Sequence, residues 1–442
     1  MRFSLCRSTL LASLLLLRAA AAFPQHIERG PDRAGSAGLM NEGSGTAQLP
    51  ASALAADGLE PRAGGWRFML HGEVVAQALA ESGSPHHRSR GVSSVNWLML
   101  HAARPVARGS LALRTMVSAE PWTVRGCGYP DLLATGEVCV GDTIHDRQHP
   151  HDLFMELAAS YEHQIGSTTR LHLYGGPVGE PALGPVTFLH RPSARGNPIA
   201  PIAHHWLDAT HVSYGVVTVG VSSNRWTIDA SAFNGREPDD RRTNIERAAW
   251  DSLSARATYA LSSRHVVQAS GGHLHDAEAG VGTLPRRDVN LLTASWIAAG
   301  DARRGRWSTT MAWSRRWGPA STSVGVRPQT SDAGLLEAAL VRTRTSWFAR
   351  AEVVGKAAHD LHADEFDPTV FIVGKLQAGG TRQLASRNGF TAAVGMTLSM
   401  SLVPAPLAPR YDGRLAPGGG IFLRLTPSAA PGPPTHAHAH RD

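Results

Sequence analysis

Apolar and polar residues alternate along most of this chain, in short segments that turn residues separate. From Trp66 onward the alternation has a period of two, as residues 66–72 and 95–101 show. Each segment is about ten residues long, which is the length that a tilted β-strand needs to cross a bilayer. The pattern therefore predicts an all-β fold.

Sixteen segments carry this pattern, with a margin of about two strands either way. They span residues 66–72, 95–101, 111–117, 153–161, 169–174, 211–221, 226–233, 252–261, 265–275, 289–298, 307–313, 335–342, 345–354, 370–376, 390–400 and 418–425. No apolar run after residue 22 is long enough for a spanning helix. We therefore predict a single transmembrane outer-membrane β-barrel of about 16 antiparallel strands (roughly 14–18) over residues 65–426.

The polar positions favour such a barrel over soluble β-domains. Many segments place arginine, aspartate, serine or histidine opposite the apolar stripe, as a wet lumen allows. Several tryptophans lie near segment ends, where aromatic belts meet the membrane interface. These are Trp97, Trp226, Trp307, Trp317 and Trp347. The alternative is that they form the cores of soluble β-domains.

The two ends of the chain differ from the barrel. Residues 1–22 are typical of a signal peptide, because Arg2 and Arg7 precede an apolar stretch and three alanines close it. Residues 23–64 are expected to be disordered and residues 427–442 to form a flexible tail, since both are rich in small residues and proline. We expect the mature protein in the bacterial outer membrane, in contact with its lipid.

The net charge gives no reason to expect a polyanionic partner. Loss of Arg2, Arg7 and Arg18 with the first 22 residues lowers the formal charge from +7 to +4. Arginine clusters interleaved with aromatic residues are missing from the sequence, so nucleic acid binding is not expected. The sequence leaves open whether a periplasmic partner exists.

Two cysteines remain after processing, Cys127 and Cys139. Both lie in a loop-like stretch with glycines and a proline. In an oxidising compartment a disulfide between them is expected. Metal ligation or a reactive thiol is the alternative.

Residues 142–152 read DTIHDRQHPHD and carry the chemistry that stands out. Imidazole and carboxylate donors together suit zinc, copper, nickel or iron. In an extended chain His149 and His151 share one side, and His145 or Asp146 could complete the ligand set. Asp152 would fix or share the charge, and Arg147 would pair with a carboxylate of the barrel wall.

A second group could add ligands if the fold brings it alongside. It comprises His204, His205 and His211, with Asp208 among them. Adjacent histidines on a strand point to opposite faces, so His204 and His205 are not expected to hold one ion there without a bulge. No cofactor is certain; copper and zinc are the candidate metals.

Five segments resemble a group of poorly characterised bacterial outer-membrane β-barrel proteins. They are residues 65–72, 141–157, 174–185, 204–215 and 233–238. The resemblance implies the fold and the location, together with a loose association with copper or heavy-metal handling. Members that look metal-related often carry a Met/His-rich stretch near the mature N-terminus, whereas residues 23–65 hold only His26 and Met40.

The favoured function is the binding or passage of a small cationic solute, without catalysis. The first alternative is a general porin-like or structural barrel with a hydrogen-bonded plug. Asp142, Asp146, Arg147, Asp152, Arg191 and Arg195 would then pair inside the lumen. The second alternative is a phospholipase-like hydrolase built from His211, Ser213 and Asn224. The tail histidines His436, His438 and His440 could also bind a cation weakly.

Overall fold

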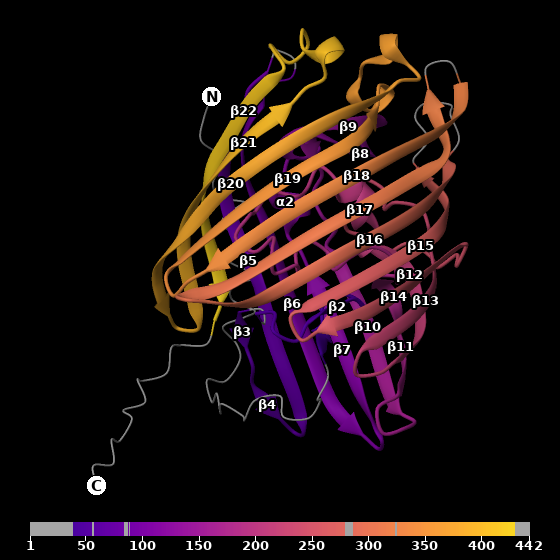
Figure 1. The fold of residues 1–442 in the computed structure, drawn as a ribbon, viewed down its shortest axis with the longest axis vertical. Helices are drawn as coiled ribbons and strands as arrows, with labels where there is room; N and C mark the ends of the chain where they lie inside the picture. Colours follow the sequence, from indigo (N-terminus) through magenta and orange to yellow (C-terminus); the bar gives the residue numbers. More distant parts are fainter. Residues whose placement is uncertain are drawn as a thin grey trace.

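A computed structural model of the chain describes residues 39–54, 57–83, 87, 89–278, 286–322 and 325–428. Sixteen antiparallel strands form a closed barrel in which each pairs with the next wall strand along the chain (Figure 1). They are β5 (Trp66–Glu81), β6 (Ser89–Val106), β7 (Gly109–Val117), β10 (Phe154–Gln164), β11 (Arg170–Gly179), β12 (Ser213–Ser222), β13 (Trp226–Phe233), β14 (Ser252–Ser262), β15 (His265–Glu278), β16 (Arg287–Ala302), β17 (Gly305–Thr322), β18 (Gly325–Val341), β19 (Thr345–Ala357), β20 (Val370–Arg387), β21 (Phe390–Leu402) and β22 (Leu415–Pro427). Each of the sixteen predicted segments overlaps one of these strands, so the predicted fold class is confirmed.

The barrel closes where β22 pairs with β5, from Gly418 opposite Glu81 to Leu425 opposite Val74. The short strands β3 (Gly58–Leu59) and β4 (Arg62–Ala63) flank β5. The wall strands are joined by turns of a few residues at one end and mostly by longer loops at the other. In bacterial outer-membrane barrels the short turns face the periplasm and the long loops face outward. We name the two ends accordingly.

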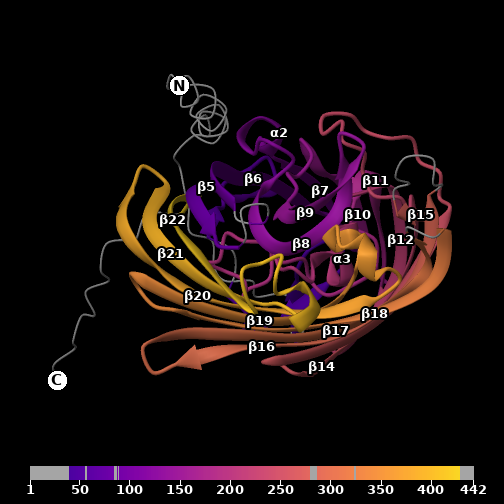
Figure 2. The same cartoon turned by 90° about the horizontal axis from the view of Figure 1, so that it is seen from above.

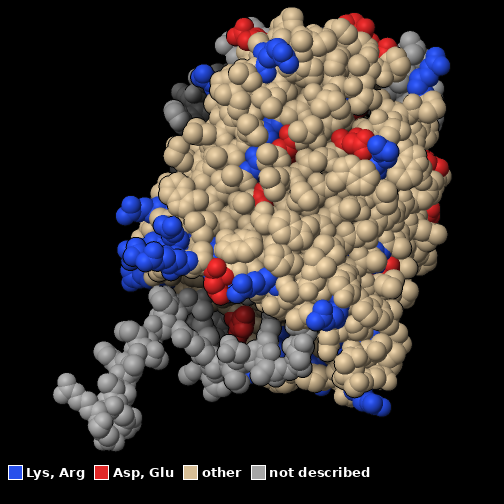
Figure 3. Space-filling model, in the orientation of Figure 1, with Lys and Arg blue, Asp and Glu red and all other residues tan. Residues whose placement is uncertain are grey.

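The wall is apolar outside and polar inside. Strand β14 shows this inversion: Ser254, Arg256 and Thr258 are buried, whereas Leu253 and Tyr259 are exposed. On the face seen in Figure 3, charged side chains gather mainly toward the two ends and leave a broad uncharged middle. An outward apolar band around a polar interior is stable only in lipid. The protein is therefore an outer-membrane barrel.

One predicted belt tryptophan is placed differently. Trp97 on β6 is buried and points into the lumen, where its ring lies 5.3 Å from that of His71 and 5.0 Å from that of His190. The prediction that Trp97 belongs to an aromatic belt is wrong. A strand has one face toward the lipid and one toward the lumen. The position of Trp97 near a segment end did not show which of the two faces it occupies.

Three segments fold into the barrel interior (Figure 2). The first, residues 39–54, holds β1 (Met40–Glu42) and β2 (Gln48–Pro50). The second, between β7 and β10, holds α2 (Glu120–Thr123), β8 (Tyr129–Cys139) and β9 (Asp142–Gln148). The third, between β11 and β12, holds α3 (His204–Leu207) and the 3-10 turn η1 (Ala209–His211).

Outside the inserted segments, the long loops carry short 3-10 turns. These are η2 (His359–Leu361), η3 (Asp364–Phe366) and η4 (Ala405–Leu407). Among the described residues, the structure contains no helix with the length and apolar character needed to span a membrane.

The expectation that residues 23–64 are disordered is wrong for residues 39–54 and 57–64, which the structure describes as ordered. The Ser44 hydroxyl donates a 2.9 Å hydrogen bond to Glu180, and Arg114 of β7 donates one of 2.6 Å to the carbonyl of Gly45. The lumen wall supplies these polar partners, so a segment with too few apolar residues for its own core is still held. Residues 1–38 and 429–442, which include the expected signal peptide and tail histidines, lie outside the described part of the chain.

The second and third inserted segments share an apolar contact with the wall. Leu132 and Leu133 of β8 pack with Trp206 of α3 against Leu335 of β18 and Phe371 of β20. This cluster fixes the two loops relative to each other and to one side of the barrel. Cys127 and Cys139 are joined by a disulfide that closes the β8 segment.

Buried charges also hold the inserted loops. Arg191 is fully buried and pairs with Glu337 of β18 and, at 3.3 Å, with Asp208. Lys375 of β20 lies 2.5 Å from Asp131 on β8 and 3.2 Å from Glu81 on β5. Loops inside the lumen are thus tied to the wall, as the plug alternative expects.

The predicted partner of Arg147 is wrong. Arg147 donates a 3.2 Å hydrogen bond to the carbonyl of Gly128, within its own inserted segment. Asp152 does form a buried ion pair, with Arg242 of the β13–β14 loop at 3.3 Å. The sequence cannot show this choice, because the partners are loop residues rather than wall residues.

Candidate metal centre

Five histidines from two inserted segments meet inside the lumen. His149 and His151 follow β9, His204 and His205 form the start of α3, and His211 ends η1. The ring centroid of His149 lies 6.0 Å from that of His204 and 5.5 Å from that of His205. The ring centroid of His211 lies 5.0 Å from that of His204 and 5.3 Å from that of His151. We call these five residues the histidine cluster.

His204 and His205 were expected to point to opposite faces of a strand, but they lie on a helical turn. Successive helical residues are about 100° apart, so neighbouring side chains can lean to one side. Their ring centroids are 5.1 Å apart. Reading this stretch as strand-like was wrong, and the correction brings both rings into the cluster.

Every ring in the cluster is oriented by an oxygen atom at its Nδ1. The partners are Pro150 O for His149 (3.1 Å), Glu120 Oε2 for His151 (3.0 Å), Asp208 Oδ1 for His204 (2.8 Å), Glu237 Oε1 for His205 (3.1 Å) and Asp208 O for His211 (2.8 Å). Because these oxygens accept, Nδ1 carries the proton and Nε2 of a neutral ring keeps its lone pair. Metal-binding histidines are oriented in this way.

The opposite ring atoms lack such partners. Nε2 of His149, His151, His205 and His211 is buried and makes no hydrogen bond within the described parts of the chain. A buried polar atom left unsatisfied costs about 1–3 kcal/mol. Four such atoms in one cluster therefore need an explanation, and a bound cation supplies one.

Glu137 is a carboxylate that lies against the histidine cluster. Its Oε1 lies 3.2 Å from Nε2 of His149, yet the geometry is not that of a hydrogen bond. His149 donates its Nδ1 hydrogen bond to the carbonyl of Pro150, so its Nε2 carries a lone pair. An ionised Glu137 would then place a carboxylate oxygen against that lone pair, and the two atoms would repel each other. Burial raises the pKa of Glu137, although Arg242 opposes this.

The protonation of the rings suits metal binding. Burial, followed by the charges of Arg242 and His205, lowers the pKa of His149 well below its ordinary value. Burial and the charge of His204 do the same for His211. Burial also opposes the charged form of His151, but the carboxylate of Glu120 outweighs it and raises the pKa. His149 and His211 are thus neutral and able to donate lone pairs.

The donor spacing fits a small ion after modest movement. One ligand atom each from His149, His204 and His205 lies within 4.8 Å of the other two. Metal–nitrogen bonds of about 2.0–2.1 Å in a tetrahedral shell place donors roughly 3.4 Å apart. An all-nitrogen set favours copper, zinc or nickel over magnesium or calcium, which need oxygen.

The structure separates the other predicted ligands from this cluster. His145 and Asp146 meet His87 of the β5–β6 loop. Asp152 instead accepts a 2.7 Å hydrogen bond from Tyr214 and pairs with Arg242. Sequence analysis also missed Glu120, Glu137 and Glu237. They sit far from the histidines in sequence, so local spacing gave no signal.

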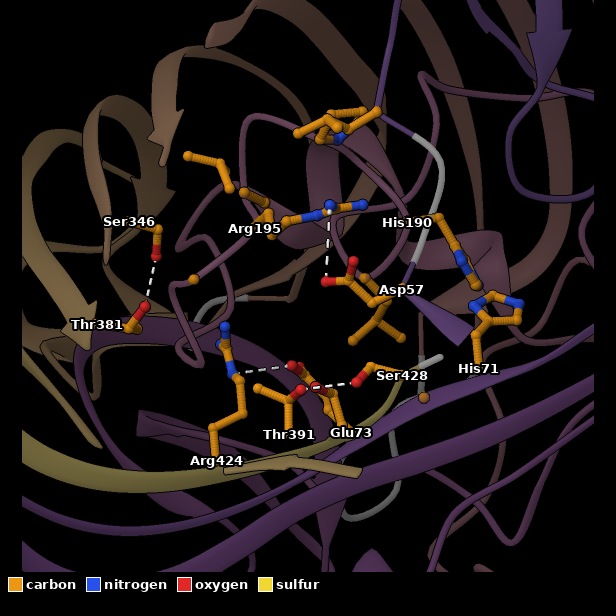
Figure 4. Close-up of a pocket in the computed structure, with 18 of the residues that line it drawn as sticks. Asp57, His71, Glu73, His190, Arg195, Ser346, Thr381, Thr391, Arg424 and Ser428 are labelled. Atoms are coloured by element: carbon orange, nitrogen blue, oxygen red, sulfur yellow. Dashed lines mark hydrogen bonds and ion pairs between the residues drawn. The ribbon is translucent and has the colours of Figure 1, made fainter. Parts of the chain in front are cut away.

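The cluster lies beside a cavity at the periplasmic end. The cavity has a volume of about 810 Å³, and His151 and Phe188 line it. Figure 4 shows His71 and His190 side by side in it, with the Arg424–Glu73 and Arg195–Asp57 pairs. On the other side of the cluster, His205 lines a small pocket of about 30 Å³ near the outward loops. The histidine cluster thus touches a space on each side.

His190 should make the barrel sensitive to acid. Burial, assisted by Arg114, lowers its pKa from 6.5 to about 4. The folded state keeps this ring neutral while the unfolded chain takes up a proton, so the free energy of unfolding should fall as the pH drops from 6.5 to 4, by up to about 3 kcal/mol. Urea unfolding in liposomes would measure this, and His190→Phe should flatten the dependence. An equally steep dependence in that variant would contradict it.

The residues of the hydrolase alternative, His211, Ser213 and Asn224, do not form a catalytic site. Ser213 donates to the carbonyl of Thr210, and His211 Nδ1 is held by Asp208. Asn224 lies in the β12–β13 turn, beyond the far end of the ten-residue strand β12. Ten extended residues span roughly 33 Å, so Asn224 cannot orient His211.

The likenesses of this chain to known proteins are remote. No protein-family model and no curated protein matches the chain. An anion-selective porin from Comamonas acidovorans shares 10% identity at a TM-score of 0.49, with 82% of this chain and 99% of that one covered. The outer membrane channel DcaP of Acinetobacter baumannii shares 10% identity at 0.48, with 84% and 100% covered. These likenesses do not indicate a solute.

The protein is an outer-membrane β-barrel. This statement rests on the closed wall and its apolar outer face. The copper association that the sequence resemblance implied stays a prediction.

Proposed function

We propose that this barrel binds a transition-metal ion, copper(II) or zinc(II), at the histidine cluster, and that this ion is the solute it handles. The supporting observation is that four neighbouring rings have a buried Nε2 without a hydrogen-bond partner in the described structure, while Nδ1 of every ring in the cluster is held by an oxygen. Such an arrangement is unfavourable unless a cation binds there.

The chain's own residues have distinct tasks in this function. His149, His204 and His205 supply the closest set of donors. Glu237 and Asp208 fix the rings, and Glu137 can balance the charge of the ion. A bound ion would supply a positive charge at this position.

A general passage function is the second candidate. It is favoured by the cavity of about 810 Å³ at the periplasmic end and by the ion pairs that tie the loops to the wall. In that case the histidines form a structural network. The solute would then be set by the size and charge of the lumen rather than by nitrogen ligands.

Metal titration of the purified full-length barrel distinguishes the metal function from general passage. Copper(II) and zinc(II) should bind tightly, and binding should persist after His436, His438 and His440 of the tail are replaced by alanine. Excess magnesium or calcium should not compete, because the cluster offers nitrogen donors. If all tight binding disappears with the tail histidines, the metal function is wrong and general passage is favoured.

A further inference from the structure

A second histidine group lies at the outer end of the lumen and shares no residue with the histidine cluster. His87 comes from the β5–β6 loop, whereas His145 and Asp146 come from β9. One ligand atom of each lies within 4.8 Å of the other two. His87 and Asp146 are buried and His145 is half-buried. We call these three residues the outer group.

The carboxylate of the outer group is held in place from several sides. Asp146 Oδ2 lies 2.7 Å from His87 Nδ1. Its Oδ1 accepts a 2.8 Å hydrogen bond from the Leu133 amide and a 3.4 Å one from Tyr411. Asp146 also has a left-handed backbone, with φ of 54°, which is uncommon for a residue with a side chain. The carboxylate is therefore positioned before any ion arrives.

The rings of the outer group are positioned by two more long loops. His87 lies 4.4 Å from the ring of Tyr411 in the β21–β22 loop. His145 lies 3.8 Å from the ring of His362, whose Nε2 is 2.9 Å from the hydroxyl of Thr143. Arg410 further holds the carbonyl of His362 at 2.8 Å. Three outward loops thus converge on β9, which Figure 1 shows near the end where those loops project.

We propose that His87, His145 and Asp146 form a second metal site at the outer mouth, which takes up a divalent transition-metal ion and passes it to the histidine cluster. A mixed set of two nitrogens and one oxygen suits zinc(II) or copper(II). The all-nitrogen cluster deeper in the lumen offers more donors of the softer kind and should bind such an ion more tightly. The direction of transfer follows from that difference. Transfer rests on the function proposed above, whereas binding at the outer group does not.

Zinc stoichiometry tests the binding. The reference is the full chain with the three tail histidines replaced by alanine, so that the tail does not contribute. His87→Gln with His145→Gln should lower the zinc content by one ion per chain, and glutamine can still hydrogen-bond to Asp146. Asp146→Asn is a second variant with little change in shape. His163→Ala with His265→Ala, at the periplasmic ends of β10 and β15, is the matched control and should lose none.

A parallel variant distinguishes the two proposals. Replacing His149 and His204 by glutamine should remove a different ion. If this variant loses an ion and the outer variants lose none, the outer site is wrong and the metal function stands. If the outer variants lose an ion and this one does not, the outer site stands and the function proposed for the cluster is wrong. If neither loses an ion, both are wrong.

The rate of loading tests the transfer. A charged site at a narrow mouth raises the local concentration of its ion, so the cluster should fill about tenfold more slowly after His87→Gln with His145→Gln. Its equilibrium affinity for zinc should stay unchanged. An unchanged filling rate would overturn the transfer, and a lost affinity would show that the two sites are not separate.

Discussion

A barrel in which His149, His204 and His205 are all replaced by alanine should lose tight binding of copper(II) and zinc(II). The affinity should fall at least about a thousandfold, because residues that only orient metal ligands are already worth roughly 10- to 100-fold. These three residues supply the closest donor atoms of the cluster. Competition with a chelator of known affinity measures the loss.

The control for this triple variant is His163→Ala with His265→Ala, which removes two imidazoles elsewhere in the barrel. It should bind the metals as the unaltered protein does. Folding is checked in both by the shift in gel migration on heating that folded barrels show. A folded triple variant whose affinity drops less than about tenfold would mean that the ion binds somewhere else.

Replacing Arg191 by methionine should destabilise the barrel and open its lumen. The change removes the arginine partner of buried Asp208 and leaves buried Glu337 with Arg350 alone, at 3.1 Å. Breaking a buried pair by removing one partner costs about 3–5 kcal/mol. The segment from residue 180 to 212 should then be held less firmly. Unfolding in urea would show the lost stability, and planar-bilayer recording should show a higher conductance.

Arg315→Met is the matched control for that prediction. Arg315 of β17 pairs with Asp332 of β18 at 3.0 Å, but both side chains are exposed. An exposed ion pair is screened by water and contributes little to stability, so stability and conductance should hardly change. If Arg191→Met behaves like this control, the buried pair does not hold the inserted loop.

The sequence predicts the barrel wall well because the wall repeats one local rule. The alternation of apolar and polar positions depends only on neighbouring residues. In β14, for example, Leu253 and Tyr259 face the lipid and Arg256 faces the lumen, as the local pattern predicts. The inserted segments follow no such rule. Residues 39–54 have no apolar core of their own. Contacts with other segments explain why they are ordered, such as the hydrogen bond from Arg114 to Gly45 and the apolar cluster that Leu49 shares with Ile297 of β16.

The candidate site could be predicted only in part, for the same reason. Five of the eight predicted metal ligands converge in the histidine cluster. His145 and Asp146 instead join His87, which lies 59 positions from Asp146 in sequence. Asp152 forms an ion pair with Arg242, 90 positions away. The way loops fold inside a lumen depends on such long-range contacts, which spacing along the chain does not encode.

X-ray absorption of the zinc- or copper-loaded barrel, with the tail histidines replaced by alanine, tests the central claim most directly. A metal in the histidine cluster should show a shell of nitrogen atoms at about 2.0–2.1 Å together with the outer-shell scattering of imidazole rings. Replacing His149, His204 and His205 should remove most of that imidazole signal. A shell of oxygen atoms without imidazole scattering in the intact cluster would contradict the account.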